Sequence, residues 1–138
     1  MKRTVLLLGL TLAAGVMAGV IGAKTLNAQQ ELVKATVLLK TDLTGVEGKE
    51  GLVVLVEHAP GANSGKHYHP GHEFAYILEG SAILEQEGKP PVRLQAGNII
   101  YYPPKEVHEG KNASTTAPLK VLVFQVNEKG QPFLVPVD

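Results

Sequence analysis

Short aliphatic and β-branched runs, separated by turns that contain glycine or proline, fill the chain from residue 31 onward. No apolar stripe at helical spacing extends beyond about two turns, so the pattern favours strands over helices. The runs cover residues 35–40, 52–57, 73–79, 82–86, 92–94, 98–102, 119–127 and 133–137. About eight strands at this spacing predict an all-β sandwich, jelly roll or barrel.

The size and composition of the chain limit its partners and its chemistry. It has 138 residues, enough for one domain with a core but too few for two ordinary domains. Thirteen Lys and Arg balance thirteen Asp and Glu, so the basic surface that nucleic-acid binding requires is missing and we expect no nucleic-acid partner. The chain has no cysteine, so any metal must be bound by histidine and carboxylate side chains.

The first 28 residues differ from the rest of the chain. Lys2 and Arg3 precede a stretch of uncharged residues, 4–23, that is mostly Leu, Val, Gly and Ala. A short cationic region before an apolar segment is typical of a secretory signal, and Ala28 offers a small residue at a cleavage point. An uncleaved anchor is the alternative, because this stretch is long enough to span a bilayer.

We therefore predict an apolar helix over residues 1–28 that acts as a signal peptide or membrane anchor, followed by a β domain over residues 29–138. Either form of the N-terminal segment predicts a periplasmic or secreted location. Contact with a membrane is expected only through this segment, if it is not cleaved.

The predicted strand 73–79 has apolar side chains on both of its faces. Ala75 and Ile77 share one face, and Phe74, Tyr76 and Leu78 share the other. In a small domain, a strand of this kind is covered either by other strands or by a second copy of the chain. We therefore expect a homodimer.

Four of the five histidines fall between residues 67 and 108. On an extended strand, His67 and His69 leave the same face about 7 Å apart and can converge on one ion. Glu73 follows after a Pro-Gly turn and adds a carboxylate, and His108 arrives from a distant strand. Three imidazoles and one carboxylate suit Fe, Mn, Ni, Cu or Zn better than Ca or Mg.

Each of these residues also has an ordinary interpretation when it is taken alone. A His-x-His pair on a strand is often solvated, Glu73 alone is a surface carboxylate, and His108 alone is a loop residue. We expect His72 to be an exposed turn residue. Alternatively, it could support Glu73 as a hydrogen-bond partner or act as a proton shuttle. We assign His58 no role. The combination and its spacing favour the metal site.

With the surrounding glycines and prolines included, the chain resembles the cupin superfamily. The first cupin motif, G-x5-H-x-H-x3-E-x6-G, is matched by Gly61, His67, His69, Glu73 and Gly80. The second, G-x5-P-x-G-x2-H-x3-N, is matched by Gly97, Pro103, His108 and Asn112. One position departs, because Lys105 stands where the motif has a glycine. Since Asn112 belongs to this motif, we interpret it as structural although Asn112-Ala113-Ser114 is formally a glycosylation sequon.

The resemblance implies a cupin-type jelly-roll β-barrel over residues 29–138, often dimeric, with one divalent transition metal held by His67, His69, Glu73 and His108. It also implies a metal-dependent, dioxygenase-like enzyme that acts on a small organic molecule, with Glu73 leaving the metal to act as a catalytic base. An isomerase or decarboxylase fits the same site. A non-catalytic module that binds a metal or a small ligand is the alternative from a different class.

Overall fold

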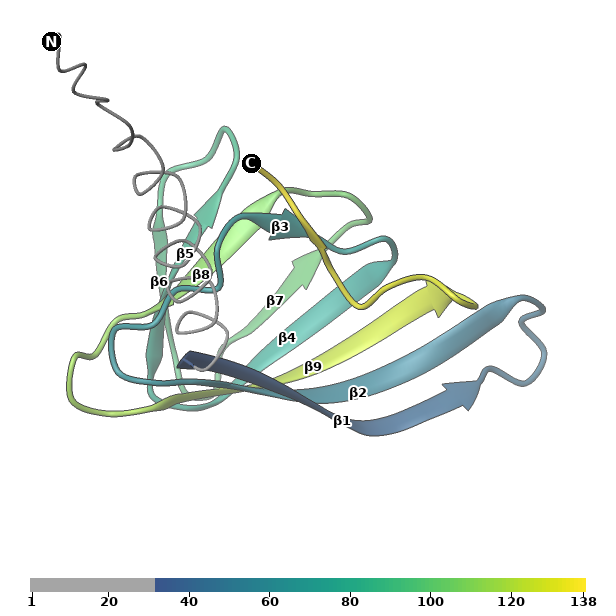
Figure 1. The fold of residues 1–138 in the computed structure, drawn as a ribbon, viewed down its shortest axis with the longest axis horizontal. Helices are drawn as coiled ribbons and strands as arrows, with labels where there is room; N and C mark the ends of the chain where they lie inside the picture. Colours follow the sequence, from purple (N-terminus) through teal and green to yellow (C-terminus); the bar gives the residue numbers. More distant parts are fainter. Residues whose placement is uncertain (1–31) are drawn as a thin grey trace, which may run out of the picture.

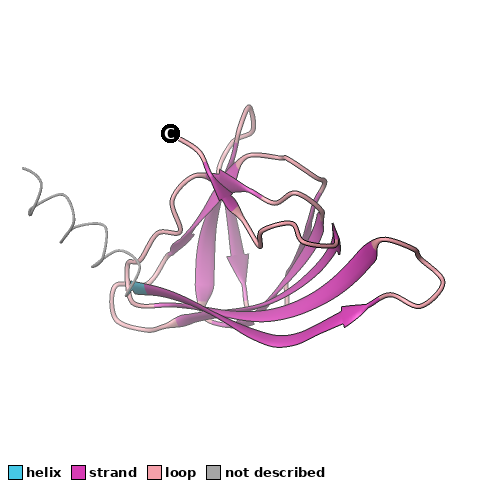
Figure 2. Ribbon diagram, turned by 45° about the vertical axis from the view of Figure 1, so that its right-hand side comes forward, coloured by secondary structure: helices cyan, strands magenta, loops and turns pink. Residues whose placement is uncertain are grey.

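The computed structural model describes residues 32–138, which form an all-β domain (Figures 1 and 2). The predicted signal or anchor, residues 1–28, lies outside the described residues. Within residues 32–138, no helix has the length and apolar character needed to cross a membrane.

Two five-stranded antiparallel sheets enclose the interior of the domain. The first sheet has the order β1 (Val33–Asp42), β2 (Lys49–His58), β9 (Leu119–Glu128), β4 (His72–Glu79) and β7 (Ile99–Tyr102). The second has the order β10 (Val135–Pro136), β3 (His67–Tyr68), β8 (His108–Asn112), β5 (Ser81–Gln86) and β6 (Val92–Gln95).

The strand pairs are nested, since β2 pairs with β9, β3 with β8, β4 with β7 and β5 with β6. This nested pairing is the topology of a long β-hairpin that is wound into a barrel, and it defines the jelly-roll fold. Apart from the consecutive pairs β1–β2 and β5–β6, neighbours in each sheet are far apart in the sequence. The predicted jelly-roll barrel is confirmed for the described residues.

Every predicted run overlaps an observed strand, but two observed strands were not among the predicted runs. These are β3 and β8, of two and five residues. They are short and mostly polar, so they have no apolar alternation to indicate them. They carry His67 and His108, which makes them the strands that matter most for the site.

The barrel interior is apolar along most of its length and polar at one end. Strand β9 shows the change, because Leu119, Val121 and Val123 point inward and are followed on the same face by Gln125 and Asn127. The apolar part forms a continuous core of ten buried residues: Leu52, Val54, Ala75, Ile77, Ala82, Leu84, Tyr102, Leu119, Val121 and Val123. The polar end holds the predicted site.

Two turn residues have backbone conformations that bear on the motif match. Gly80 has φ +86°, and a Cβ atom there would lie 2.6 Å from the Pro118 carbonyl oxygen, so only glycine fits. Lys105 has φ 67° and is the one non-glycine residue with positive φ in the described part of the chain. The turn therefore keeps the glycine conformation of the motif although its residue is lysine.

Candidate metal centre

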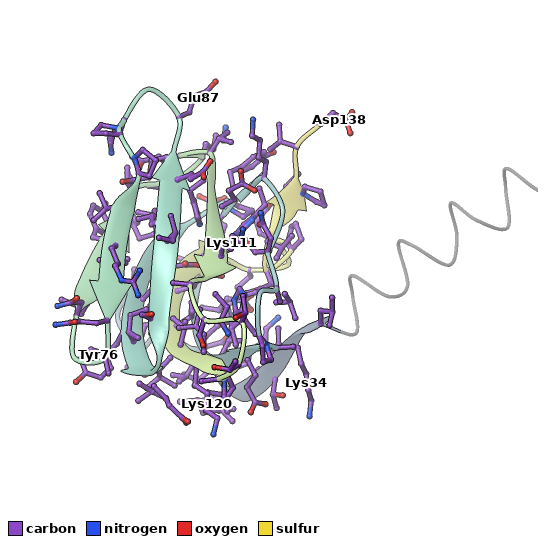
Figure 3. All side chains as sticks on the ribbon, turned by 90° about the vertical axis from the view of Figure 1, so that its left-hand side faces the viewer. Lys34, Tyr76, Glu87, Lys111, Lys120 and Asp138 are labelled. Carbon is purple, nitrogen blue, oxygen red and sulfur yellow. The ribbon has the colours of Figure 1, made fainter. Side chains whose placement is uncertain are left out.

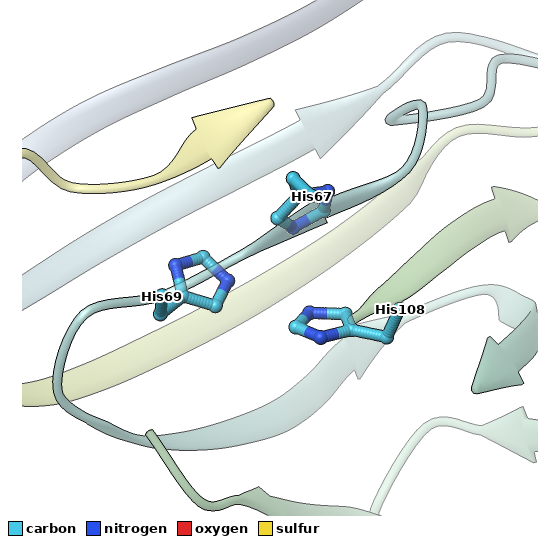
Figure 4. A group of neighbouring side chains, drawn as sticks. All are labelled: His67, His69 and His108. Atoms are coloured by element: carbon cyan, nitrogen blue, oxygen red, sulfur yellow. The ribbon is translucent and has the colours of Figure 1, made fainter. Parts of the chain in front are cut away.

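Three histidines converge inside the barrel (Figure 4). The ring centroids of His67, His69 and His108 lie 4.6–5.1 Å apart, and one nitrogen from each ring lies within 4.8 Å of the others. His67 and His108 are brought together by direct pairing of β3 with β8. All three rings are buried. Three buried imidazoles at this separation could hold a metal ion.

The backbone around the three rings sets which nitrogen is available to a metal. The Nδ1 atom of His67 lies 2.8 Å from the Gly65 carbonyl oxygen, and that of His108 lies 3.0 Å from the Glu106 carbonyl oxygen. A carbonyl oxygen can only accept, so each Nδ1 carries the proton and each Nε2 keeps its lone pair. Metal-bound histidines are held in this way in proteins, so the tautomers fit a metal centre.

His69 has the same arrangement, with Nδ1 2.8 Å from the Phe133 carbonyl oxygen. The Gln125 Nε2 atom also lies 2.7 Å from this Nδ1. When His69 Nδ1 donates to the Phe133 carbonyl, it cannot also accept from the Gln125 amide, because both nitrogens are then donors. We therefore assign the Nδ1 proton to the Phe133 carbonyl and the Gln125 amide hydrogen to Glu73, whose Oε2 is 2.6 Å away. Asn127 donates to Gln125 Oε1 at 3.1 Å, which fixes the orientation of this amide.

Burial keeps the imidazoles of His67 and His108 neutral. Desolvation lowers the pKa of His108 to about 4, and repulsion from His67 and His69 acts in the same direction. Desolvation also lowers the pKa of His67 below its usual range. A metal ligand must be unprotonated, so these rings are ready to bind at neutral pH without first losing a proton.

Glu73, the predicted fourth ligand, is buried on the inward face of β4 beside the histidines. Its Oε2 atom lies 2.9 Å from His69 Nε2, the nitrogen that would face an ion. The structure therefore places all four predicted ligands at one site. The three histidines lie within reach of one another, and Glu73 lies beside them in contact with His69.

The sequence interpretation missed two residues that support the ligands. Gln125 contacts both Glu73 and His69, and the Phe133 carbonyl accepts from His69. Gln125 could have been found in the sequence, because its amide follows Val121 and Val123 on the same face of a largely aliphatic strand. Phe133 acts through its backbone, so its side-chain type carried no signal. Tyr102 is buried in the barrel interior, and its ring stacks on that of His108 with the two centroids 3.8 Å apart.

The histidines line a cavity of about 510 Å³ that occupies the barrel interior. Its deeper wall is apolar, formed by side chains such as Ile77, Leu84 and Val121. Its lining includes Lys66 and Val137, which are exposed at the surface. A small, mostly apolar molecule could therefore enter and lie against the imidazoles.

The remaining histidines lie apart from the cluster. His72 is exposed on the outer face of β4, where its Nδ1 is 2.8 Å from the Tyr101 hydroxyl, so it does not support Glu73. His58 lines the same cavity, and desolvation lowers its pKa to about 4. Asn112 is 1% exposed, and its amide donates to three backbone carbonyls, as expected for a structural residue.

Comparison with known families agrees with this geometry. A family model described as a cupin domain matches residues 54–125, about half of the chain, and that segment includes all four predicted ligands. The chain belongs to the cupin family. The resemblance seen in the two sequence motifs is thereby confirmed.

Among solved structures, this cupin is similar to a protein with a double-stranded β-helix domain from Klebsiella pneumoniae. The TM-score is 0.60 at 23% identity, over 77% of this chain and 84% of the other. It is also similar to a cupin-like protein from Thermotoga maritima, with a TM-score of 0.56 at 26% identity, over 72% of this chain and 77% of the other. The first of these likenesses concerns the fold alone.

Among curated proteins, the cupin is 29% identical over 69 residues to a 3-hydroxyanthranilate 3,4-dioxygenase from Xanthomonas euvesicatoria. The matched part is 48% of this chain and 39% of the relative. Enzymes of the same description from Xanthomonas campestris match over the same length. The chain thus spans well under half the length of the curated relatives it matches.

Proposed function

We propose that this cupin is a metal-dependent, dioxygenase-like enzyme that acts on a small organic molecule bound in the barrel. The observation that carries the proposal is the set of three buried histidines that converge at the wall of a cavity, each with its Nδ1 held by a backbone carbonyl. A purely structural metal site would be closed to small molecules, whereas this one faces a space that can admit a substrate.

The proposed ligands are His67, His69, His108 and Glu73, and their mixed nitrogen and oxygen donors suit Fe, Mn, Ni, Cu or Zn. When bound there, such an ion would supply Lewis-acid activation of a substrate oxygen and a place for dioxygen beside it. Four protein ligands leave one or two positions open on a five- or six-coordinate ion, as this chemistry requires.

The chain's own side chains would bind and orient the substrate. The apolar wall that includes Ile77 and Val121 takes up the hydrocarbon part and excludes water. Glu73 is the proposed base, and it would accept the proton of a substrate hydroxyl at Oε2. Gln125 donates to that same oxygen, so it would hold the carboxylate in position during the transfer.

The similarity to 3-hydroxyanthranilate 3,4-dioxygenases supports oxygen chemistry but leaves the substrate open. The matched 69 residues are 39% of the relative, so most of that enzyme has no counterpart in the comparison. We therefore base the proposed reaction type on the similarity to this relative. The proposed substrate class is based on the cavity, and it is a small and mostly apolar molecule with an enolic or phenolic hydroxyl.

The test combines metal analysis with oxygen uptake. The protein is purified from the compartment in which it accumulates, its metal content is determined by elemental analysis, and oxygen consumption is recorded with a panel of phenols, aminophenols and diketones. We expect about one transition metal per chain and uptake with some panel members, with both atoms of ¹⁸O₂ in the product. His108→Ala should abolish uptake, and His72→Ala, outside the cluster, should not.

Two outcomes would contradict the proposal. A full metal site without any oxygen uptake, together with tight binding of panel compounds, would favour the non-catalytic module. Turnover of a panel compound without oxygen consumption would favour an isomerase or decarboxylase.

We also propose that the protein is exported, because of the cationic and apolar pattern of residues 1–28. N-terminal sequencing of protein from fractionated cells tests this. A mature chain beginning near Gln29 in the periplasm or medium supports a cleaved signal, and a chain that retains Met1 in the membrane fraction supports an anchor. Full-length protein in the cytosol would contradict both.

A further inference from the structure

His58 is a buried histidine that lies outside the proposed metal centre, and no step of the proposed function uses it. It is the last residue of β2, its side chain faces inward and is 6% exposed, and it lines the same cavity as the histidine cluster. Its Nδ1 atom is enclosed by protein and has no hydrogen-bond partner among residues 32–138. A buried polar atom without a partner costs stability, and such atoms often have a functional role.

The three histidines of the cluster differ from His58 in this respect. Each of them has a backbone carbonyl oxygen 2.8–3.0 Å from Nδ1, which fixes the tautomer of the ring. The Ala62 backbone lies near the His58 ring and acts to raise its pKa, against the larger effect of desolvation, but Nδ1 forms no hydrogen bond with it. The protein therefore leaves the tautomer of His58 open, so that a ring nitrogen can serve either as a donor or as an acceptor.

His58 and the histidine cluster lie at opposite ends of the barrel interior. Lys34 and Lys120, which follow the two strand partners of His58, lie at the lower end of the domain in Figure 3. Glu87, which follows the strand partner of His108, lies at the upper end of the same view. The cavity therefore has an imidazole at each end.

Strand β8 gives the distance between the two ends. The Asn112 amide donates to the His58 carbonyl at 3.3 Å, and His108 lies four residues (112 minus 108) before Asn112 on the same strand. Four residues of extended strand span about 13–14 Å. The side chains of His58 and His108 both line the space between these backbone positions, so a molecule shorter than this distance can contact both.

The wall between the two ends is apolar, and it includes Ile77, Leu84 and Val121. The cavity volume of about 510 Å³ falls within the ~300–1,000 Å³ of pockets that bind drug-sized ligands. A ligand that reached only the histidine cluster would leave the far part of this space unfilled. The cavity therefore suits a ligand with an apolar body and a polar group at each end.

Burial also decides which polar group suits His58. Desolvation lowers the pKa of His58 to about 4, and repulsion from His67 acts in the same direction, so the ring is neutral at pH 7. A carboxylate beside a neutral ring would lose its hydration without gaining an opposite charge. A hydroxyl can both donate and accept, so it matches either tautomer of the ring.

The backbone around His58 is held in place. The Asn112 side chain is 1% exposed, and its amide donates to the carbonyls of both His58 and Ala59. The Ala59 N–H donates to the Leu32 carbonyl at 2.8 Å, and the Ala62 N–H donates to the Ala59 carbonyl at 3.0 Å. A side chain on such a fixed strand end can select a ligand precisely.

We propose that His58 binds the far end of the ligand whose near end lies at the proposed metal centre. The ligand is a small molecule with an apolar body, a metal-binding oxygen at one end and a neutral hydroxyl at the other. A ring nitrogen of His58 forms a hydrogen bond with that hydroxyl. The role of His58 rests on the proposed function, because the metal centre defines the near end, and it adds the group that the substrate carries at its far end.

The test is ligand binding to the full chain loaded with Zn²⁺, which has no redox chemistry and therefore binds catechols without turnover. The probes are 4-ethylcatechol and 4-butylcatechol, each paired with the analogue that carries a hydroxyl on the last carbon of its alkyl chain. Calorimetry measures the four dissociation constants. We expect wild type to bind at least one hydroxylated probe about fivefold more tightly than its alkyl partner, the effect of one added hydrogen bond.

Three variants assign this preference to a side chain. His58→Phe keeps a ring but no nitrogen, so it should lose the preference and still bind the alkyl probes. His58→Gln keeps a hydrogen-bonding group and should retain part of the preference. His72→Phe is the matched control, because His72 is exposed on the outer face of β4, and it should behave as wild type. Circular dichroism shows whether each variant keeps its fold.

Equal affinities within both probe pairs in wild type would overturn the role of His58 and leave the proposed function intact. A folded His58→Phe variant that keeps the preference would do the same. If none of the four probes binds, the role of His58 is also overturned, and oxygen uptake then decides the proposed function separately. A preference that is lost in His58→Phe, in a protein without oxygen uptake, would support the role of His58 and contradict the proposed enzyme.

Discussion

Gln125 is the side chain on which the arrangement of the proposed ligands most depends. Its amide donates to Glu73 and lies against His69, and Asn127 holds it from behind. It is 1% exposed, so no water can replace these bonds. A buried amide that orients a proposed ligand would act on a bound metal through that ligand.

We therefore predict that Gln125→Leu weakens metal binding by about 10–100-fold, the usual effect of losing a residue that orients a ligand. Calorimetric titration of the metal-free chain with Zn²⁺ or Co²⁺ measures the change. Gln95→Leu, at an exposed position on β6, is the control and should bind as wild type does. Unchanged affinity in Gln125→Leu would show that Glu73 and His69 hold their positions without the amide.

Lys105 is the residue at which the chain departs from the cupin motif, and its backbone keeps the conformation that glycine prefers. A residue with a Cβ atom in the left-handed region costs about 1–2 kcal/mol, partly offset by the ~0.5–1 kcal/mol of extra chain entropy that glycine loses on folding. The Lys105 N–H donates to the His69 carbonyl at 2.9 Å, which holds this turn against the site.

Lys105→Gly should therefore stabilise the protein by about 0.5–1 kcal/mol. Urea unfolding measures the change in free energy. Lys34→Gly, on an exposed strand position with ordinary backbone geometry, should instead destabilise the protein. Loss of stability in Lys105→Gly would mean that the lysine side chain contributes more than its backbone conformation costs.

At the scale of elements, the sequence predicts the long strands well and the short ones poorly. Strands such as β4 and β9 are long runs rich in aliphatic, β-branched and aromatic residues, and these runs are visible in the sequence. Strands β3 and β8 are held by their neighbours rather than by their own composition. The ligand histidines were predicted from motif spacing, because their strands carried no signal of their own.

Strand β10 shows most clearly why part of the site could not be predicted. It pairs with β3, and the residues before it supply the carbonyl that binds His69 Nδ1. Backbone groups have the same chemistry in every residue, so no residue type at position 133 could indicate this role. Only the path of the chain brings Phe133 to His69.

Removal of residues 132–138 is predicted to lower metal affinity at least tenfold, because His69 loses the acceptor that fixes its tautomer and β3 loses its neighbour. Competition with a chromogenic chelator measures the affinity. Phe133→Ala keeps the backbone carbonyl and should lose much less. Equal losses in the two variants would assign the effect to the phenyl ring, whose centroid is 5.4 Å from that of His69.

For the whole molecule, the buried histidines make stability depend on pH. Burial lowers the folded-state pKa of His58 and His108 to about 4, whereas an unfolded histidine titrates near 6.5. Between these values the unfolded chain binds more protons than the folded one, so stability falls as pH falls. The contribution is fully present above pH ~6.5 and is lost progressively toward pH ~4.

We predict that the metal-free protein loses about 2–3 kcal/mol of stability for each of these two histidines across that range. Urea unfolding at a fixed protein concentration between pH 7 and 4.5 measures it. His58→Leu should reduce the slope, and His72→Leu, which is exposed, should not. An unchanged slope in His58→Leu would mean that this ring is charged in the folded state.

The nesting of the strands has a consequence for when the site can form. His67 and His108 are paired although they are 41 positions apart in the sequence (108 minus 67), and His69 needs a backbone carbonyl that residue 133 supplies. Contacts between such remote segments form slowly, since a long stretch of polypeptide must be ordered before they are made. A chain without residue 133 therefore lacks part of the proposed metal site, and we expect an ion to bind only after this segment has joined the barrel.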